Sequence, residues 1–306
     1  MRYQQSSYDV PEDKTLRVII DTDAANEADD QFAIAQALLS PRLDIRAICA
    51  AHFGDEKSPH SMEDSYQEIL KVVGLLNHKC DVFHMPVLRG AEKALTDDTV
   101  ALSEGAEAII AEALREDEHP LYVVSLGALT NVASALRAEP TIADRMTLIW
   151  IGGNVYPEGG WEYNLKNDLT AARVVFSSRV PLWQVPRNTY QMMLVSIAEL
   201  ALQVRPQGEL GRYLFEHMVE WGHTFWGKRS KMRTGECWYL GDSPAIGLLL
   251  NEHEFCYHYE RAPEIRDDMT YAPGTADREI RVYDRIDSRF ILSDLYAKLA
   301  LLERGE

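Results

Sequence analysis

Acidic side chains crowd one short stretch of the chain, residues 21–30. The stretch reads Asp-Thr-Asp-Ala-Ala-Asn-Glu-Ala-Asp-Asp, so four aspartates and a glutamate fall close together. Carboxylates held this close repel one another at neutral pH unless a cation joins them. Asp and Glu oxygens are the ligands that hard divalent ions prefer, above all Ca²⁺. The residue types therefore indicate a metal site or a catalytic site.

The flanking residues predict where this acidic stretch lies in the fold. Residues 16–20 form an apolar, β-branched run typical of a buried strand, and residues 31–39 repeat apolar side chains at helical spacing. The acids would then follow the carboxyl end of a strand, where open α/β sheets bind their ligands. A solvated loop with one Asp capping the helix is the alternative. Four aspartates directly after one buried strand favour a metal or catalytic site over a solvated loop.

Two other metal-dependent motifs also begin with Asp-x-Asp. An EF-hand loop requires Gly at its sixth position and Glu at its twelfth. Counted from Asp21, those positions hold Asn26 and Phe32, which excludes an EF-hand. A phosphatase of the haloacid-dehalogenase type would use Asp21 as its nucleophile with Mg²⁺. Such enzymes usually have Thr or Val where this chain has Ala25, so this alternative is weaker but open.

The rest of the sequence predicts the fold class. Strand-like runs, each followed by a loop and a helical pattern, recur up to about residue 190, which indicates an α/β fold with a mostly parallel central sheet flanked by helices. Strands are expected over residues 43–51, 82–88, 121–126, 148–151, 182–185, 254–260 and 279–283. No repeat or linker divides the sequence. We therefore expect a single domain over residues 1–306, with residues 1–15 as an N-terminal arm.

Composition excludes several classes of function. The 306 residues carry a net charge of -17, which argues against nucleic acid or an anionic membrane as a partner. The four cysteines show no CxxC pairing, which argues against a zinc site or a disulfide framework. The first residues lack the apolar core of a signal peptide, and no segment approaches the length of a membrane span. The expected location is cytoplasmic.

The acidic stretch resembles the opening motif of the inosine–uridine-preferring nucleoside hydrolases, Asp-x-Asp-x-Gly-x-Asp-Asp. Four residues match its acids, namely Asp21, Asp23, Asp29 and Asp30. The family commonly has three residues between the second and third Asp, whereas this chain has five, residues 24–28. The usual Pro-Gly is absent. The acids carry the resemblance, and the longer loop between them departs from it.

Later stretches resemble further motifs of the same family, in the same order. Residues 127–131 (Gly-Ala-Leu-Thr-Asn) are similar to Gly-Pro-Leu-Thr-Asn, and residues 241–245 (Gly-Asp-Ser-Pro-Ala) are similar to His-Asp-Pro-x-Ala. Gly152-Gly153 followed by Glu162, Asn164 and Asp168 resembles the segment that grips the sugar hydroxyls. Together these motifs extend from residue 16 to about residue 250.

The resemblance implies a fold and an activity. The fold would be the open, Rossmann-like nucleoside hydrolase architecture. The activity would be that of a calcium-dependent N-glycosyl hydrolase, a glycosidase that cleaves a ribonucleoside or a related ribosyl compound to ribose and a free base. Such cleavage develops oxocarbenium character at the anomeric carbon. Family members are usually homodimers or homotetramers.

The resemblance also implies a role for each site residue. Ca²⁺ would be held by Asp23, Asp30, Asp242 and the carbonyl of Thr130. Asp23 would be the catalytic general base that takes a proton from the attacking water. The ribose hydroxyls would be held by Asp29, Glu162 and Asn164. His52, where the family often has an Asn, is either a ribose contact, a substitute acid or an ordinary loop histidine.

One departure concerns the leaving group. Many family members have a His that precedes the distal Asp and protonates the departing base, but this chain has Gly241, which cannot donate a proton. Candidates for that side lie in the segments expected to cap the base, namely His223, Trp226, Glu236, Trp238 and Tyr239. An aromatic ring there could stack on the base, and Glu236 or His223 could donate a proton. Aromatic core packing is the other interpretation. Gly241 also leaves open a non-catalytic sugar or nucleoside binder that keeps its metal.

Overall fold

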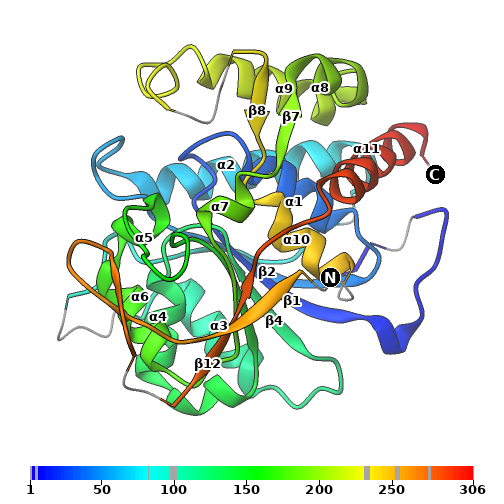
Figure 1. Ribbon diagram of the computed structural model, residues 1–306. Helices are drawn as coiled ribbons and strands as arrows, with labels where there is room; N and C mark the ends of the chain where they lie inside the picture. Colours follow the sequence, from blue (N-terminus) through cyan, green and yellow to red (C-terminus); the bar gives the residue numbers. More distant parts are fainter. Residues whose placement is uncertain are drawn as a thin grey trace.

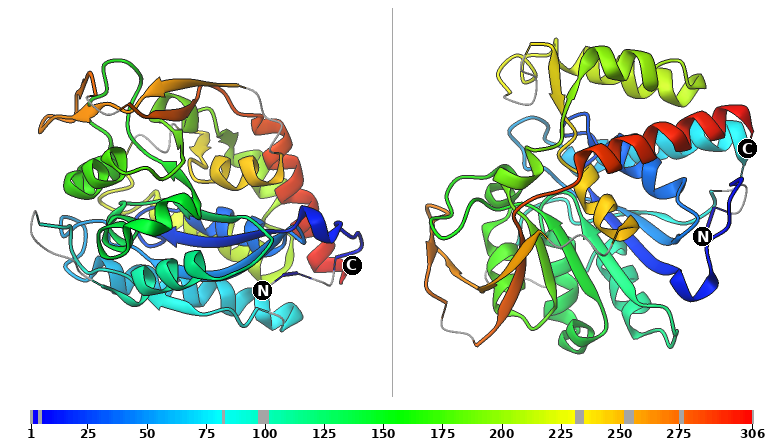
Figure 2. Two further views of the ribbon diagram at one scale, coloured as in Figure 1. Left: turned by 90° about the horizontal axis from the view of Figure 1, so that it is seen from below. Right: turned by 45° about the vertical axis from the view of Figure 1, so that its right-hand side comes forward.

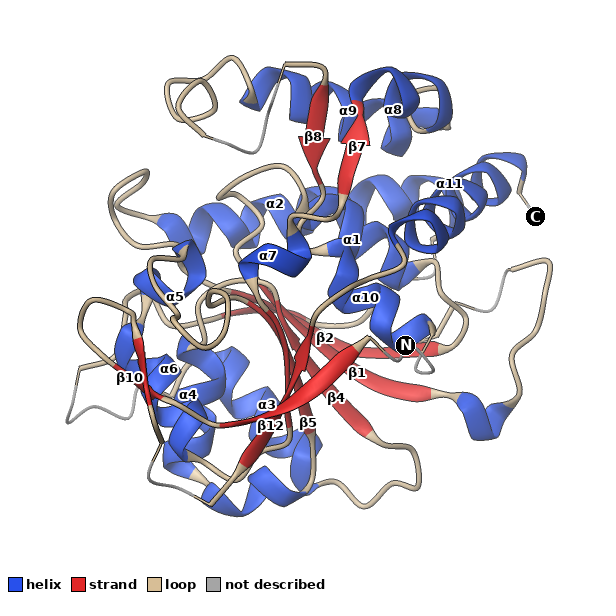
Figure 3. Cartoon of the chain, viewed as in Figure 1, coloured by secondary structure: helices blue, strands red, loops and turns tan. Residues whose placement is uncertain are grey.

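The computed structural model describes residues 2–3, 6–81, 83–96, 102–230, 235–251, 256–274 and 277–305. Within these ranges, one eight-stranded sheet has the strand order β3-β2-β1-β4-β5-β6-β12-β9 (Figures 1 and 3). Its strands are β1 (Leu16–Thr22), β2 (Leu43–Ala50), β3 (Val87–Arg89), β4 (Leu121–Ser125), β5 (Thr147–Ile151), β6 (Leu182–Val185), β9 (Tyr257–Arg261) and β12 (Glu279–Tyr283). Only β9 runs antiparallel to its neighbour in this described sheet, so the predicted mostly parallel sheet is confirmed.

The strand order reverses direction beside β1. The chain passes from β1 outward through β2 to β3, then returns to β4 on the other side of β1 and continues to β5 and β6. Every residue of β1 is buried, as expected for a continuous apolar run covered on both faces. Ligands of open α/β sheets bind at the carboxyl ends of the strands where the order reverses. The acidic stretch follows β1 at this point.

Helices cover both faces of the sheet (Figure 2). One core cluster includes residues of α1 (Asp30–Leu38), α2 (Ser61–Cys80), α10 (Ser243–Leu250) and α11 (Ser288–Arg304). The other includes residues of α3 (Glu104–Leu114), α4 (Thr130–Ala138) and α6 (Leu169–Ser177). No helix of the described residues is both long and apolar enough to cross a membrane.

A small subdomain, here called the cap, stands apart from the sheet at the top of Figure 1. It comprises β7 (Leu194–Ser196), α8 (Ile197–Gln203), α9 (Gly208–Trp221), residues 222–230 and β8 (Cys237–Tyr239). β7 and β8 pair antiparallel, and α9 contacts α2. The short helices α5 (Tyr163–Asn167) and α7 (Arg187–Tyr190) lie between the cap and the sheet (Figure 1).

The remaining elements are short, and two predicted strands differ from the observed ones. The hairpin β10 (Glu264–Ile265) and β11 (Tyr271–Ala272) and the 3-10 turns η1 (Glu12–Lys14) and η2 (Pro140–Asp144) complete the described elements. The strand predicted over 82–88 is observed only as β3, with residue 82 outside the described ranges. The strand predicted over 254–260 is observed as β9, with residues 254–255 also outside them.

Candidate active site

A cavity of about 430 Å³ lies at the carboxyl ends of β1, β4 and β5. Its volume falls in the range of small-molecule sites. Six acidic residues of the described ranges line it, namely Asp23, Glu27, Asp29, Asp30, Glu162 and Asp242. Aromatic and basic residues complete much of the wall, namely Trp161, Tyr163, Tyr190, Trp226, Lys57, Arg187 and Arg229. The acids therefore belong to one cavity rather than to a solvated loop.

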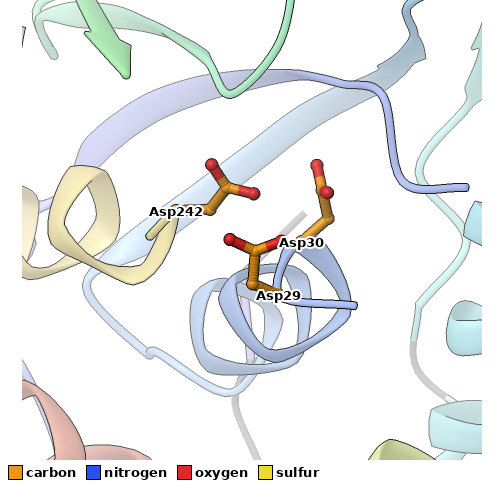
Figure 4. Close-up of side chains that lie close together, drawn as sticks. All are labelled: Asp29, Asp30 and Asp242. Carbon is orange, nitrogen blue, oxygen red and sulfur yellow. The ribbon is translucent and has the colours of Figure 1, made fainter. Parts of the chain in front are cut away.

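Three of these carboxylates form a compact group. Oxygens of Asp29, Asp30 and Asp242 lie within 4.8 Å of one another, and all three side chains are buried (Figure 4). Asp29 precedes α1 and Asp242 precedes α10, yet neither side chain accepts a capping hydrogen bond from its helix. Helix capping, the simplest explanation for a single Asp, therefore does not account for this group.

Electrostatics show that this group suits a cation. Burial and the charges of Asp30 and Asp29 raise the pKa of Asp23 well above its ordinary value. Burial and the neighbouring aspartates likewise raise the pKa of Asp29 and Asp242, and burial raises that of Asp30 to about 6. Oxygen ligands at this density match the donor set of a hard divalent ion such as Ca²⁺. A bound cation would let all of these groups ionise.

Asp23 is fixed from two sides. Asn26 Nδ2 donates to Asp23 Oδ2 at 3.0 Å. On the other side lies Gly127, where an added Cβ would come 2.7 Å from Asp23 Oδ1. Only glycine lets the end of β4 approach the carboxylate this closely.

Asp21, the first acid of the motif, has a different environment. It is fully buried, does not line the cavity, and accepts hydrogen bonds from Asn131 Nδ2 at 2.8 Å and from Ser125 Oγ at 3.4 Å. Burial raises its pKa to about 7. These bonds join β1 to β4 and α4. A carboxylate enclosed in this way cannot act as the nucleophile that a haloacid-dehalogenase-type phosphatase requires.

The structure brings the expected sugar-binding residues to the same cavity. Glu162 Oε2 accepts from the backbone N–H groups of Gly153 and Leu165, both at 2.9 Å, and its Oε1 accepts from Tyr190 Oη at 3.0 Å. Asn164 Nδ2 donates to the carbonyls of Leu126 at 2.8 Å and Ile151 at 2.9 Å. Both side chains are therefore held rigidly beside the carboxylate group.

His52 and Thr130 do not line the cavity. Thr130 is the first residue of α4, and its Oγ1 donates to Asp168 Oδ2 at 2.7 Å and bonds His52 Nε2 at 2.7 Å. His52 Nδ1 accepts from the Gly54 N–H at 3.1 Å, so Nε2 carries the proton. Burial lowers the pKa of His52. At the end of β4, Leu126 lines the cavity and directs its carbonyl to Asn164.

Four leaving-group candidates lie away from the cavity. Trp238 is fully buried in the cap, edge-on to Trp221 at 5.7 Å between ring centroids. The alternation of β8, paired with β7, points Trp238 into the cap core. Tyr239 is half-buried, Glu236 and His223 are exposed, and none of the four lines the cavity. Trp226 does line it.

Several residues that line the cavity were not predicted from the sequence to belong to the site. Asn26 and Glu27 lie in the extra loop, residues 24–28, and its unusual length was the available signal. Trp161 and Tyr163 alternate with Glu162 and Asn164, a pattern that could have marked them. Lys57, Arg187, Tyr190 and Arg229 carry no local signal, because they reach the cavity only through the tertiary fold.

Known proteins resemble this chain in sequence and fold. A family model described as "Inosine-uridine preferring nucleoside hydrolase" matches residues 18–289. The pyrimidine-specific ribonucleoside hydrolase RihA of Escherichia coli O127:H6 (strain E2348/69 / EPEC) is 32% identical over 193 residues, which cover 55% of this chain and 58% of RihA. The alignment thus spans less than two thirds of this relative.

Two solved structures share the fold across nearly their whole length. A plant nucleoside hydrolase, the PpNRh1 enzyme, has a TM-score of 0.71 and 20% identity over 93% of this chain and 99% of its own. A purine-preferring ribonucleoside hydrolase from Gardnerella vaginalis has a TM-score of 0.71 and 19% identity over 94% and 99%. The matched residues 18–289 include every residue named above as lining the cavity. The chain therefore belongs to the inosine-uridine preferring nucleoside hydrolase family.

Proposed function

We propose that this protein hydrolyses the N-glycosidic bond of a ribonucleoside or a related ribosyl compound, with Ca²⁺ as its cofactor. The observation that carries the proposal is the buried group of Asp29, Asp30 and Asp242 in one cavity with Asp23, Glu162 and Asn164. These residues match the family's motifs in identity and order.

The proposed metal ligands are the carboxylates of Asp23, Asp30 and Asp242 with one backbone carbonyl. The structure favours the carbonyl of Leu126 over that of Thr130, because Leu126 lines the cavity beside Asn164 and Thr130 does not. When bound, a Ca²⁺ ion would offset the carboxylate charges and lower the pKa of a water molecule.

Asp23 is the proposed general base. Its carboxylate is held by Asn26 and confined by Gly127, so it keeps one orientation toward the attacking water. An ionised Asp23 carboxylate can accept the proton of the attacking water. Together with Asp29 it also places negative charge near the anomeric carbon, where oxocarbenium character develops.

The substrate would bind with its ribose against the acids and its base toward the aromatic wall. The Asp29 and Glu162 carboxylates and Asn164 Oδ1 would accept hydrogen bonds from ribose hydroxyls, since the Asn164 amide already donates to two backbone carbonyls. Trp161, Tyr163 and Trp226 line the cavity and offer ring faces or edges to a base.

A non-catalytic nucleoside binder is the second candidate. No histidine is among the described residues that line the cavity, and Gly241 has no side chain to protonate a base. A binder would keep the carboxylate group and the sugar contacts. Turnover of any ribosyl substrate would eliminate it.

The deciding experiment measures ribose release from purine, pyrimidine and 4-nitrophenyl ribosides, with Ca²⁺ and with a chelator. Release that the chelator abolishes and Ca²⁺ restores is the expected result. No release from any substrate, with Ca²⁺ still bound, would contradict hydrolysis of these ribosides and favour the binder.

A cytoplasmic location is also proposed, from the sequence composition, and a homodimer or homotetramer, from the family resemblance. Light scattering of the purified protein would measure the oligomeric state. A monomer at micromolar concentration would contradict the second proposal.

A further inference from the structure

Lys57 is a largely enclosed cation at the cavity wall. Of the residues that the structure describes, three basic ones line the cavity, namely Lys57, Arg187 and Arg229. The two arginines bond to backbone carbonyls: Arg187 Nη1 to Trp161 O at 3.4 Å and Arg229 Nη1 to Phe225 O at 3.1 Å, with Arg229 exposed. The Lys57 side chain is only 11% exposed.

One asparagine positions both Lys57 and the proposed general base. Lys57 Nζ donates to Asn26 Oδ1 at 2.6 Å and to Asn26 O at 3.2 Å. The amide of the same residue donates to Asp23 Oδ2 at 3.0 Å. The third contact of Lys57, with Glu27 Oε1, is longer at 3.4 Å. Asn26 thus links the Lys57 ammonium to the Asp23 carboxylate.

Lys57 also faces the aromatic wall below the cap. Its Nζ lies 4.6 Å from the ring centroid of Tyr163 and 5.5 Å from that of Trp221 at the end of α9. Trp221 Nε1 donates to Asn26 O at 3.2 Å, which ties the extra loop, residues 24–28, to the cap. The ammonium therefore lies against Tyr163, one of the rings that line the cavity and would meet the base.

Glycosidic cleavage creates a charge on that side. When the C1′–N bond breaks, its electron pair stays on the base nitrogen, and the hydroxyl of water bonds to C1′. Of the described cavity residues, none is a histidine, and burial raises the pKa of the Tyr163 and Tyr190 hydroxyls, so they are poor acids. A fixed cation can stabilise the negative charge without transferring a proton.

We propose that Lys57 is the catalytic group on the leaving-group side, where its ammonium stabilises the negative charge on the departing base. This assignment rests on the proposed function. Asp23 takes one proton of the attacking water and later releases it to solvent. Lys57 transfers no proton, and the departed base takes a proton from solvent, so no acid at position 241 is needed.

The experiment compares Lys57→Met, Lys57→Gln and Lys57→Arg on uridine and on 4-nitrophenyl riboside. Nitrophenolate is a stable anion and needs little assistance, whereas the uracil anion needs more. Lys166→Met is the matched control, because Lys166 Nζ also faces the Tyr163 ring, at 5.8 Å, but pairs with Glu56 and does not line the cavity. Lys57→Gln retains a donor to Asn26 if the Met variant fails to fold.

We expect Lys57→Met and Lys57→Gln to lower kcat on uridine by about 100-fold. Their loss of kcat on the nitrophenyl riboside should be smaller than the loss on uridine by at least a factor of ten. Lys57→Arg should recover most of the uridine activity, and Lys166→Met should match the wild type on both. Equal losses on the two substrates, or no loss, would overturn the role of Lys57 while leaving the hydrolase standing. A wild-type protein that cleaves neither riboside would overturn the proposed function itself.

Discussion

Gly127 lies against the carboxylate of Asp23, so closely that a methyl group at Gly127 would meet Asp23 Oδ1 at 2.7 Å. The two residues follow neighbouring strands, β1 and β4, which pair in parallel. The strand pairing thus sets the orientation of the proposed general base. Asn26 completes the arrangement from the opposite side at 3.0 Å.

Gly127→Ala should therefore lower kcat by about 100-fold, because displacing a reacting group by roughly 1 Å has an effect of this size. The matched control is Gly74→Ala in α2, where an added Cβ meets nothing within 4 Å. That change should leave activity intact and stabilise the helix by up to about 1 kcal/mol. Steady-state kinetics on a ribosyl substrate measures both, and wild-type kcat in Gly127→Ala would show that this contact does not position Asp23.

Asp242→Asn should have opposite effects on the stability of the calcium-free and calcium-bound protein. Without calcium, folding must either bury the Asp242 charge beside Asp29 and Asp30 or protonate that carboxyl; Asn requires neither, so the free energy of unfolding should rise. With calcium it removes a proposed ligand. The wild type should gain about 2.7 kcal/mol at a calcium concentration 100 times the Kd, and the variant should gain much less.

Thermal unfolding in chelator and in excess calcium measures both effects. The exposed pair of Asp144 with Arg179 supplies a control, because Asp144→Asn changes the net charge equally but lies outside the cavity. Equal stabilisation of Asp242→Asn and wild type by calcium would exclude Asp242 as a ligand.

The sequence was sufficient for the fold and the carboxylate group because each has a local pattern. Strand, loop and helix alternate along the chain, and Asp23, Asp29 and Asp30 follow directly after a buried strand. The Gly-Ala-Leu-Thr-Asn segment marked the right loop, but not which carbonyl faces the cavity. That depends on where β4 ends and α4 begins, and it places Leu126 rather than Thr130 at the wall.

Which side chains of the cap face the cavity could not be predicted from local sequence patterns. Whether Trp238 or Tyr239 faces a ligand depends on which strand pairs with β8, and the pairing with β7 buries Trp238 against Trp221. Lys57 reaches the cavity from the loop after β2 without any motif of its own. Contacts between segments far apart in sequence decide both cases.

His52 should make stability, rather than catalysis, depend on pH. Burial lowers its pKa below the ordinary value of 6.5, so the unfolded chain binds a proton at a higher pH than the folded chain does. The stabilisation from neutral His52 is therefore present above pH 6.5 and is lost as the pH falls toward the folded pKa. His52→Gln can still donate to Thr130 Oγ1 but does not titrate.

Denaturant unfolding at several pH values tests this expectation. The wild type minus His52→Gln difference in unfolding free energy should be largest at pH 8 and shrink toward pH 5. A difference that is constant with pH would contradict it. If His52 were instead the acid for the leaving group, His52→Gln would lose uridine turnover and keep nitrophenyl riboside turnover.

Asn164→Asp should weaken substrate binding and lower the free energy of unfolding. The Asn164 amide donates to the carbonyls of Leu126 and Ile151, at the ends of β4 and β5. A carboxylate cannot donate to them and adds a further negative charge to a cavity that already holds six acidic residues. Leaving one buried carbonyl without its donor costs about 1–3 kcal/mol, so we expect lower stability, a higher KM and a lower kcat together.

Asn154→Asp is the matched control for this change. The Asn154 amide also donates to a backbone carbonyl, that of Trp161 at 3.0 Å, but its side chain lies at the surface and outside the cavity. Kinetics on uridine and denaturant unfolding should show a large effect for Asn164→Asp and a small one for Asn154→Asp. Equal effects on KM would mean that the loss at Asn164 comes from added charge alone. A wild-type KM in Asn164→Asp would contradict a ribose contact that depends on the orientation that these two hydrogen bonds give the Asn164 side chain.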